Sequence, residues 1–317
     1  MGWLQSFLSL ANGIPSHDTF RRVFMLIDPD AFEACFSAWA QSFAEAVDRE
    51  VVAIDGKTLR RSFDRSRAQG SLHLVSASEQ GLALGQREVD GKSNEITAIP
   101  ALLETLSLKN CIVTLDAMGC QKTIAGQILD QCADYLLVLK ANHSKAFLAV
   151  KECCERHCFA RDATAKPVFD AFDDSHGRLV RRRVFVCPQA ASLEVLDAWS
   201  GLRTVLAVET IRGVNGSGKV EAEIRYFLSS CRDDPTVLVQ AIRRHWTIEN
   251  GLHWVLDVTF REDDSRVRDR TAARNLAILR KIAINLMGRD RTPRISMRAR
   301  RKQAAWNDEY MLSLLTG

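Results

Sequence analysis

The chain has 317 residues, of which 46% are apolar and 26% are charged, and its formal net charge is +4. This composition excludes a disordered or collagen-like chain and provides enough apolar residues for one large domain or two smaller ones. No run of about 18 uncharged apolar residues is present, and the first residues, MGWLQSFLSLANGIPSHD, lack the features of a signal peptide. We therefore expect a soluble, cytoplasmic protein with no membrane segment.

The charge is distributed unevenly along the chain. Between Arg261 and Lys302 fourteen Lys or Arg residues stand against five Asp or Glu residues, which gives this segment a net charge of +9. A second basic cluster begins at Lys57. Each cluster alone is compatible with a solvated charged face, but the asymmetry between segments indicates a polyanionic partner.

The first half of the chain alternates between helical and strand-like patterns. Residues 1 to 48 repeat apolar positions at helical spacing, and the following segments change to short β-branched runs. We predict strands at 51–55, 71–77, 81–89, 111–116 and 133–140, and helices at 94–106 and 121–132. The resulting order is β-β-β-α-β-α-β.

The second half of the chain begins with a region in which strand-like patterns predominate. Residues 165 to 230 contain four strand-like runs and a glycine-rich turn at Gly213, Gly216 and Gly218, which indicates an inserted β region. We predict a helix over 235–256, with Pro235 in its first turn, and an amphipathic helix over 272–287. A basic segment follows it.

The nine cysteines are an odd number at irregular spacing, which favours reduced thiols over a disulfide framework. The densest cluster, ECCERHC, contains Cys153, Cys154, His157 and Cys158. This cluster could hold zinc, but no second pair of cysteines stands at zinc-finger spacing. Free thiols at the end of a helix are the preferred interpretation.

Asp55 and Asp116 each follow a hydrophobic strand. In a sheet with strand order 3-2-1-4-5 their strands are neighbours, so the two carboxylates would lie side by side. Such a pair is unfavourable unless cations lie between its members. Mg²⁺ or Mn²⁺ suits these oxygen ligands, and two ions about 3.5 to 4 Å apart can activate a water and stabilise the leaving oxygen of a phosphodiester. The alternative is that each aspartate caps a loop.

Glu249 could supply a third carboxylate from the helix predicted over 235–256. His245, Glu249 and His253 stand four residues apart and would lie on one strip of that helix. The spacing does not match the His-Glu-x-x-His pattern of zinc proteases. Trp246 and Trp254 flank the strip and are expected to pack on the sheet, although stacking on an unpaired base is physically reasonable.

Four other acidic residues compete with Glu249 for this role: Asp257, Glu262, Asp263 and Asp264. The LDV sequence around Asp257 is typical of a buried strand, and the EDD sequence at 262–264 is typical of an exposed turn. We therefore prefer Glu249.

Several stretches resemble the ISAs-type, or H-repeat-associated, bacterial insertion-sequence transposases, which belong to the DDE class and have a ribonuclease-H-like fold. The matching stretches are GIPSHDTFRRVF, AIDGKTLRRS, KSNEITAIPALLETL, VTLDAMGCQ, LKANH, HGR, HWTIENGLHWVLDVTFREDDSR and ARNLAILRKIAINL. The resemblance implies an α/β fold with a mixed five-stranded sheet, flanking helices, an inserted β region and helical N- and C-terminal segments. It also implies that Asp55, Asp116 and Glu249 are the catalytic residues and the ligands of two Mg²⁺ or Mn²⁺ ions.

The resemblance suggests a division into three parts. These are a helical N-terminal segment at 1–48 that looks truncated, a catalytic domain at 49–290 with its β insertion at about 160–232, and a basic C-terminal tail at 291–317. The chain departs from the family pattern at His143, where glutamine is more usual, and at Ile242, His245 and Leu256, where a tyrosine, an arginine and a lysine would accompany the third acid.

The function implied is metal-dependent cleavage of DNA at the ends of an insertion sequence and strand transfer into target DNA. The alternative is an inactive or repurposed DNA-binding or nuclease derivative. The expected partners are double-stranded DNA and a second copy of the chain, in the cytoplasm and associated with the nucleoid. The residues expected to contact DNA are Lys57, Arg60, Arg61, Lys140, Asn142, Arg243, Arg244, His245, Trp246, Arg266, Arg268 and Arg274.

Overall fold

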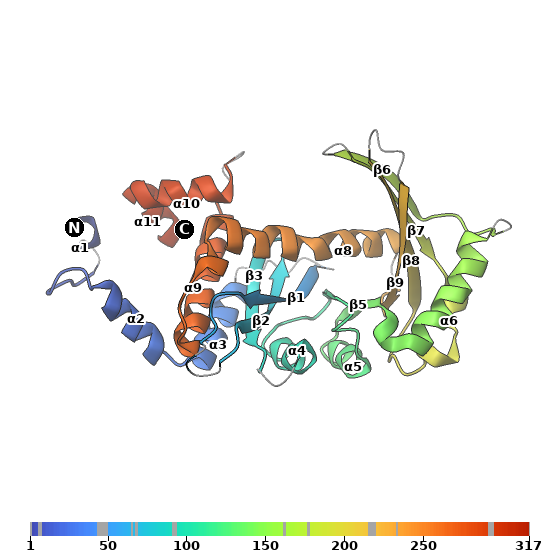
Figure 1. The fold of residues 1–317 in the computed structure, drawn as a ribbon, viewed down its shortest axis with the longest axis horizontal. Coiled ribbons are helices and arrows are strands. Elements are labelled where there is room, and N and C mark those ends of the chain that lie inside the picture. Colours follow the sequence, from blue (N-terminus) through green and yellow to red (C-terminus); the bar gives the residue numbers. More distant parts are fainter. Residues whose placement is uncertain are drawn as a thin grey trace. The chain divides into compact units, whose positions relative to one another are not determined.

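The chain folds into two compact units in the computed structural model (Figure 1). Unit 1 comprises Met1–Glu45, Gly56–Leu106 and Ile248–Gly317, and unit 2 comprises Ala46–Asp55 and Ser107–Thr247. The structure describes residues 2–5, 8–42, 50–64, 66, 69–90, 94–160, 163–175, 178–214, 220–232, 234–290 and 295–316. Neither unit is continuous in sequence, so this division differs from the expected parts at 1–48, 49–290 and 291–317.

Unit 1 combines a β-hairpin with most of the helices. Its elements are α1 (Gly2–Gln5), α2 (His17–Leu26), α3 (Pro29–Gln41), β2 (Leu72–Glu79), β3 (Leu82–Glu88), α4 (Glu95–Leu103), two π-helical segments at Ile248–His253 and Val255–Thr259, a 3₁₀ turn at Glu262–Asp264, α9 (Arg270–Gly288), α10 (Met297–Trp306) and α11 (Asp308–Thr316). Side-chain oxygens of Ser16 and Asn94 accept backbone N–H groups at the starts of α2 and α4, because the first turn of a helix leaves its donors unpaired. The hairpin and α4 confirm the sequence prediction.

Unit 2 contains most of the sheet. Its elements are the first part of β1 (Val51–Leu59), β4 (Ile112–Leu115), α5 (Lys122–Asp130), β5 (Asp134–Leu139), a 3₁₀ turn at Ala141–His143, α6 (Ser144–Cys154), a π-helical segment at Glu155–Phe159, β6 (Phe169–Ser175), β7 (Arg178–Val186), α7 (Pro188–Ala191), a 3₁₀ turn at Glu194–Leu196, β8 (Thr204–Val214), β9 (Val220–Ser229) and α8 (Pro235–Thr247). Of the predicted glycine turn, Gly216 and Gly218 lie outside the described residues. No helix among the described residues combines the length and apolar character needed to cross a bilayer.

The strand order is β3-β2-β1-β4-β5-β9-β8-β7-β6, with β1 belonging to both units. Its first five strands have the predicted order 3-2-1-4-5. The predicted β region is present as β6 to β9, but it extends the same sheet, so the sheet has nine strands among the described residues instead of the expected five. Strand β9 pairs antiparallel with β5, with Leu136 opposite Ser229, and β8, β7 and β6 continue the same ladder. This pairing satisfies the backbone groups that β5 would otherwise leave at an open edge.

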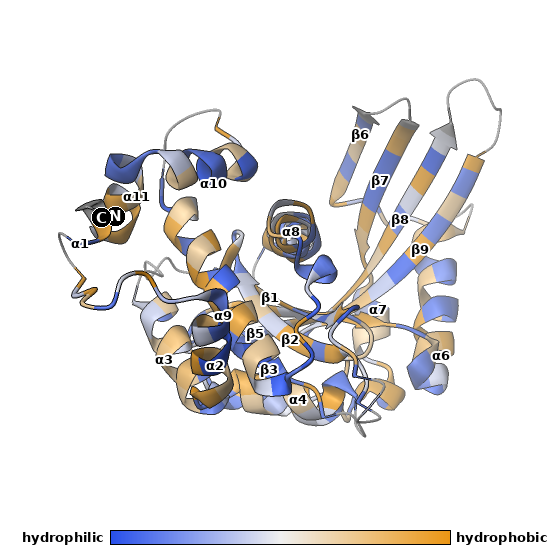
Figure 2. Ribbon diagram, turned by 60° about the vertical axis from the view of Figure 1, so that its left-hand side comes forward, coloured by the Kyte–Doolittle hydropathy of each residue, from blue (hydrophilic) through white to orange (hydrophobic). Residues whose placement is uncertain are grey.

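The core of unit 2 lies between the sheet and α8. Leu238, Val239 and Ile242 of α8 pack against a cluster that includes Ile112 and Leu136. Each of these large apolar side chains contributes about 1.5 to 3 kcal/mol when it is buried. Helix α5 covers the opposite face of the same strands (Figure 1), where Ile124 and Ile128 are buried. Strands β6 to β9 alternate between hydrophilic and hydrophobic residues along their length (Figure 2).

The helix predicted over 235–256 has a different geometry. Helix α8 ends at Thr247, and the chain continues through π-helical turns as far as Thr259. The LDV sequence at 256–258 was expected to be a buried strand, and that prediction is wrong. The chain stays helical through the Asn250-Gly251 pair and keeps Leu256 and Thr259 buried.

Two buried cations hold unit 1 together. Lys281 of α9 is 1% exposed, and its Nζ donates a hydrogen bond of 2.6 Å to Gln86 Oε1 on β3. Burial lowers its pKa to about 8. Arg274, also on α9, forms an ion pair of 3.0 Å with the buried Glu33 of α3. These contacts join α3, β3 and α9 through polar groups, which cost stability if they lose their partners.

Lys57 forms the centre of a second ionic network in unit 1. Its Nζ lies 2.8 Å from Asp257 Oδ1, 3.2 Å from Glu262 Oε2 and 3.3 Å from Asp263 Oδ1. Burial alone would lower the pKa of Lys57, but the three carboxylates raise it above its usual value. Glu262 is 1% exposed, so the exposed turn expected at 262–264 is wrong at this residue. Its burial is possible because Lys57 and Arg280 both face it.

We predict that Lys57→Met destabilises the protein by about 3 kcal/mol or more, because it leaves the carboxylate of Glu262 buried without its main counter-ion. Arg60→Met is the matched control. Arg60 contacts Asp263 of the same network, but its side chain is 81% exposed, so its loss should cost less than about 1 kcal/mol. Urea unfolding of the two variants measures the difference, and equal stabilities would contradict the structural role of Lys57.

We also predict that stability falls as the pH is lowered from about 6.5 to about 4. Burial of His245 on α8 lowers its pKa to about 4, so in this window the unfolded chain binds a proton that the folded chain does not. His245→Gln should flatten the pH dependence of the free energy of unfolding by an amount on the order of 2 kcal/mol. The control His17→Gln removes a histidine whose side chain is 94% exposed and should leave the curve unchanged.

Candidate functional site

Asp55 lies in the middle of β1 and Asp116 directly follows β4, so the strand predicted over 51–55 continues beyond Asp55 to Leu59. Strand β1 pairs with β4 so that Ile54 is opposite Leu115, and the two aspartates are the next residues after this pair. Adjacent strands are about 4.8 Å apart, so the register places these two residues side by side. Both are half-buried.

The same register indicates which face of the sheet the aspartates share. Val51 and Ile112 belong to the apolar cluster that α8 covers, and side chains alternate between faces along a strand. Thr114 follows Ile112 on that face and confirms the alternation, because its Oγ1 lies 2.9 Å from His245 Nδ1 on α8. Asp55 and Asp116 stand at the next positions of the same alternation.

The loop after β4 orients the carboxyl group of Asp116. Its Oδ1 accepts the backbone N–H groups of Met118 at 2.9 Å and Gly119 at 3.2 Å. Asp116 therefore does cap its loop, as the alternative interpretation proposed. A cap made through one oxygen is compatible with metal binding, because a carboxylate has about four lone-pair positions.

The residue after Asp55 must be a glycine. A Cβ built on Gly56 would lie 2.0 Å from Glu95 Oε1 and 2.9 Å from His73 Nε2. Glu95 and His73 are themselves 2.8 Å apart, and His73 Nδ1 lies 2.7 Å from Thr58 Oγ1. These hydrogen-bonded side chains of unit 1 pack directly against the backbone of β1 at Gly56. They hold the strand in place just beyond Asp55.

Glu249 lies in unit 1, in the π-helical segment Ile248–His253. Its side chain is exposed, whereas Ile248 and Leu252 on either side are buried. No described residue of unit 1 forms an ion pair with Glu249. Of its four competitors, Asp257, Glu262 and Asp263 are all engaged by Lys57, and Asp264 pairs with Arg261 at 2.8 Å. Glu249 is thus the acid of this stretch that no neighbouring cation in its unit engages.

The two histidines expected beside Glu249 are poor proton acceptors. Burial lowers the pKa of His245 to about 4. It also lowers the pKa of His253 to about 3, with additional repulsion from Lys281 and Lys57. Both imidazoles are therefore neutral at pH 7, and neither adds positive charge to its surroundings.

Two of the expected DNA contacts have a structural role instead. Lys57 and Arg274 have side chains that are 9% and 11% exposed, and each pairs with at least two carboxylates. A phosphate contact would require these ionic networks to open. We therefore leave both residues out of the DNA-contacting set proposed below.

Three more expected contacts are engaged within unit 2. His245 lies against Thr114, and Arg244 faces Glu50 with an N–O distance of 4.0 Å. Asn142 donates from Nδ2 to the carbonyl of Ala117 at 2.8 Å. Its neighbour His143 lies 2.5 Å from the carbonyl of Cys120. The LKANH stretch thus supports the loop that follows Asp116.

The remaining expected contacts are exposed. They are Arg60, Arg61, Arg266 and Arg268 in unit 1, and Lys140, Arg243 and Trp246 in unit 2. Arg60 and Arg61 do pair with Asp263 and Asp264, but exposed ion pairs contribute little to stability, so exposed arginines and lysines like these can still neutralise phosphates.

Trp246 contacts the sheet as predicted, through Arg225 of β9, but neither Trp246 nor Trp254 is a core residue. Trp246 is 40% exposed and Trp254 is 55% exposed. The buried apolar residues of this stretch include Ile248, Leu252, Val255 and Leu256. The guanidinium of Arg225 on β9 lies 5.2 Å from the centre of the Trp246 ring, which leaves a cationic aromatic surface in unit 2.

Sequence analysis missed Thr114, which anchors α8 to β4 through His245. The sequence contained a signal for this contact. Thr114 is a polar residue in an otherwise apolar strand, and it stands two positions before Asp116, on the same face of the strand. Thr114 is 1% exposed, and a buried hydroxyl needs a hydrogen-bond partner. That partner could not be named, since His245 is distant in sequence.

The arrangement of Asp55 and Asp116 fits divalent cations. Two carboxylates one strand spacing apart repel each other, and a hard cation with oxygen ligands relieves this repulsion. These features favour metal-assisted chemistry on a phosphate ester.

Comparison with known proteins agrees with this geometry. A family model described as "Transposase DDE domain" matches residues 47–286, and a second, described as "DDE_Tnp_1-associated", matches residues 1–40. The chain is 38% identical to the H repeat-associated putative transposase YhhI of Escherichia coli K12, over 100% of this chain and 85% of the relative. It is 40% identical to the putative transposase YncI of Escherichia coli O157:H7, over 99% of this chain and 81% of the relative. These matches cover the strands that carry Asp55 and Asp116, and we conclude that the chain belongs to the DDE transposase family.

Proposed function

We propose that the protein is the transposase of an insertion sequence, which cleaves DNA at the element ends and joins the freed 3′ ends to target DNA. The observation that carries this proposal is the parallel register of β1 and β4, which brings Asp55 next to Asp116 in unit 2. The family model covers both strands and the segment that contains Glu249.

In this proposal, Asp55, Asp116 and Glu249 bind two Mg²⁺ or Mn²⁺ ions. Glu249 follows His245 by four residues, and His245 contacts Thr114 on the face that Asp55 and Asp116 share. Glu249 is therefore close in sequence to a residue on that face, which supports its role as the third acid. The ions, when bound, supply charge stabilisation and an activated water for phosphodiester cleavage.

The protein residues around the carboxylates keep the site negative. His245 is neutral at pH 7 because burial lowers its pKa to about 4, so it does not compete with cations for Asp55 and Asp116. The backbone N–H groups of Met118 and Gly119 hold Asp116 in one orientation. A preoriented ligand loses less entropy when it binds an ion or a substrate.

The proposed DNA-contacting set consists of Arg60, Arg61, Lys140, Arg243, Trp246, Arg266 and Arg268. All are exposed. The arginines and Lys140 would bind backbone phosphates, and Trp246 would stack on an unpaired base. Since two element ends must be held together during transposition, we propose a homodimer in the DNA complex.

A second function is a nuclease or DNA-binding derivative that has the same fold without strand transfer. The exposed cationic surface favours DNA binding in either case. Incubation of the protein with Mn²⁺ and DNA carrying the element ends separates the two functions. Joined products support the transposase, and cleavage without joining supports the nuclease.

We predict that Asp55→Asn, Asp116→Asn and Glu249→Gln each reduce cleavage by about 10²- to 10⁴-fold, because each removes one ligand of ions that contribute several kcal/mol of charge stabilisation. DNA affinity in the absence of metal should stay within a few fold of wild type. Cleavage of labelled end DNA measures the first effect, and a mobility-shift titration measures the second.

The matched control for these three variants is Asp264→Asn, an exposed acid of the same stretch as Glu249 that pairs with Arg261. It should cleave at the wild-type rate. Metal-dependent cleavage that persists in one of the three variants removes that residue from the proposed triad.

We predict that Arg266→Ala combined with Arg268→Ala weakens DNA binding and makes it less sensitive to salt. The slope of log affinity against log salt should fall by about 1 for each arginine lost. The control is Lys151→Ala on α6, where Lys151 pairs with Glu155. A double variant with the wild-type slope would show that these arginines do not contact phosphates.

A further inference from the structure

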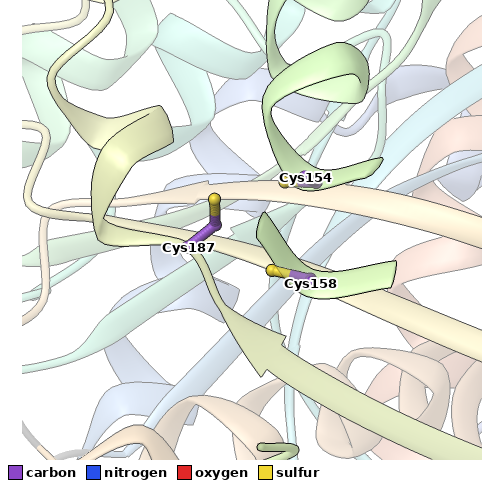
Figure 3. Close-up of side chains that lie close together, drawn as sticks. All are labelled: Cys154, Cys158 and Cys187. Atoms are coloured by element: carbon purple, nitrogen blue, oxygen red, sulfur yellow. The ribbon is translucent and has the colours of Figure 1, made fainter. Parts of the chain in front are cut away.

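Three buried thiols converge in unit 2 from two segments that are distant in sequence (Figure 3). Cys154 ends α6 and Cys158 lies one turn later in the π-helical segment, while Cys187 directly follows β7. Their exposed fractions are 0%, 6% and 0%. Every pair of their sulfur atoms lies within 4.8 Å.

The spacing of the sulfur atoms fits a tetrahedral metal centre. Zinc binds thiolates at about 2.3 Å, which places the sulfur atoms of a tetrahedron about 3.8 Å apart. Cys153 Sγ lies 4.0 Å from Cys187 Sγ, but Cys153 does not belong to the group of sulfur atoms that all lie within 4.8 Å of one another. Shifts of less than about 1 Å would bring the three sulfur atoms to ligand distances.

The chemistry of the ligands indicates which kind of metal ion the cluster would bind. A buried thiolate without a counter-ion is costly, and a divalent cation removes that cost. Sulfur ligands select zinc and similar soft ions over Mg²⁺ or Mn²⁺, so this cluster differs in chemistry from the carboxylates of Asp55 and Asp116.

We propose that Cys154, Cys158 and Cys187 bind one zinc ion. The ion would fasten the end of α6 to the segment between β7 and α7, and so brace the strands that extend the sheet beyond β5. We assign the ion a structural role, because all three thiols are buried. This proposal is independent of the function proposed above.

Metal binding to the full chain tests the proposal directly. The reduced protein is titrated with Zn²⁺ against a chromogenic chelator, and with Co²⁺ under visible spectroscopy. Wild type should bind one Zn²⁺ per chain and should give the intense absorption of tetrahedral, thiolate-ligated Co²⁺. Its thermal midpoint should rise with added zinc, since an ion that binds only the folded state stabilises it.

Variants locate the ligands. Cys158→Ser and Cys187→Ser should each lower zinc affinity by more than about 100-fold, and Cys153→Ser should lower it much less. The matched control is Cys231→Ser, which changes a fully buried thiol of the same unit outside the cluster. The double variant Asp55→Asn, Asp116→Asn should bind zinc as wild type does.

Three results would overturn the proposal. The first is wild-type protein that binds no more zinc than Cys187→Ser, with both proteins folded by circular dichroism. The second is a Co²⁺ spectrum without thiolate absorption. The third is a disulfide between cluster cysteines in the protein as isolated, detected as fewer than nine reactive thiols after unfolding without reductant.

Discussion

The parallel pairing of β1 with β4 is the constraint on which the proposed chemistry depends. It sets Ile54 opposite Leu115 and thereby fixes Asp55 beside Asp116 on the face that α8 covers. Two carboxylates held this way repel each other, and the apolar packing of α8 stabilises the sheet that holds them together. In the proposed function, a divalent cation bound between the two carboxylates relieves this repulsion. The DDE family to which the chain belongs uses divalent metals.

Burial divides the basic residues into two groups with different roles. Lys57, Arg274 and Lys281 are enclosed and face the acids or amides of unit 1. Arg60, Arg61, Arg266 and Arg268 are exposed and are available to a polyanion. The same ionic network that engages Lys57 also engages the acids that compete with Glu249. Basic residues that pair with buried acids and basic residues that we propose as DNA contacts are thus neighbours in the sequence. Only the burial of their side chains distinguishes the two groups.

Much of the fold follows from local sequence patterns, because hydrophobic periodicity reports which face of an element is buried. The strands at 51–55 and 111–116, the hairpin, α4 and the order of the first five strands were all predictable in this way.

Contacts between residues that are distant in sequence were not predictable from local patterns. The pairing of β9 with β5 and the approach of Cys187 to Cys154 were therefore missed. The continuation of α8 as π-helix was also missed, since a helical pattern does not report its hydrogen-bond register. The proximity of Asp55 to Asp116 could be predicted because it follows from the order of the strands. The burial of Lys57 could not, because it depends on acids some 200 residues away in the sequence.

The central claim is that Asp55 and Asp116 hold divalent cations, together with Glu249. Crystals of the protein soaked in Mn²⁺ and measured for anomalous scattering test it most directly. The account predicts Mn²⁺ peaks bound to carboxylate oxygens of Asp55 and Asp116, with Glu249 completing the ligand set. Mn²⁺ bound instead among Asp257, Glu262 and Asp263, with Asp55 and Asp116 free of metal, would contradict it.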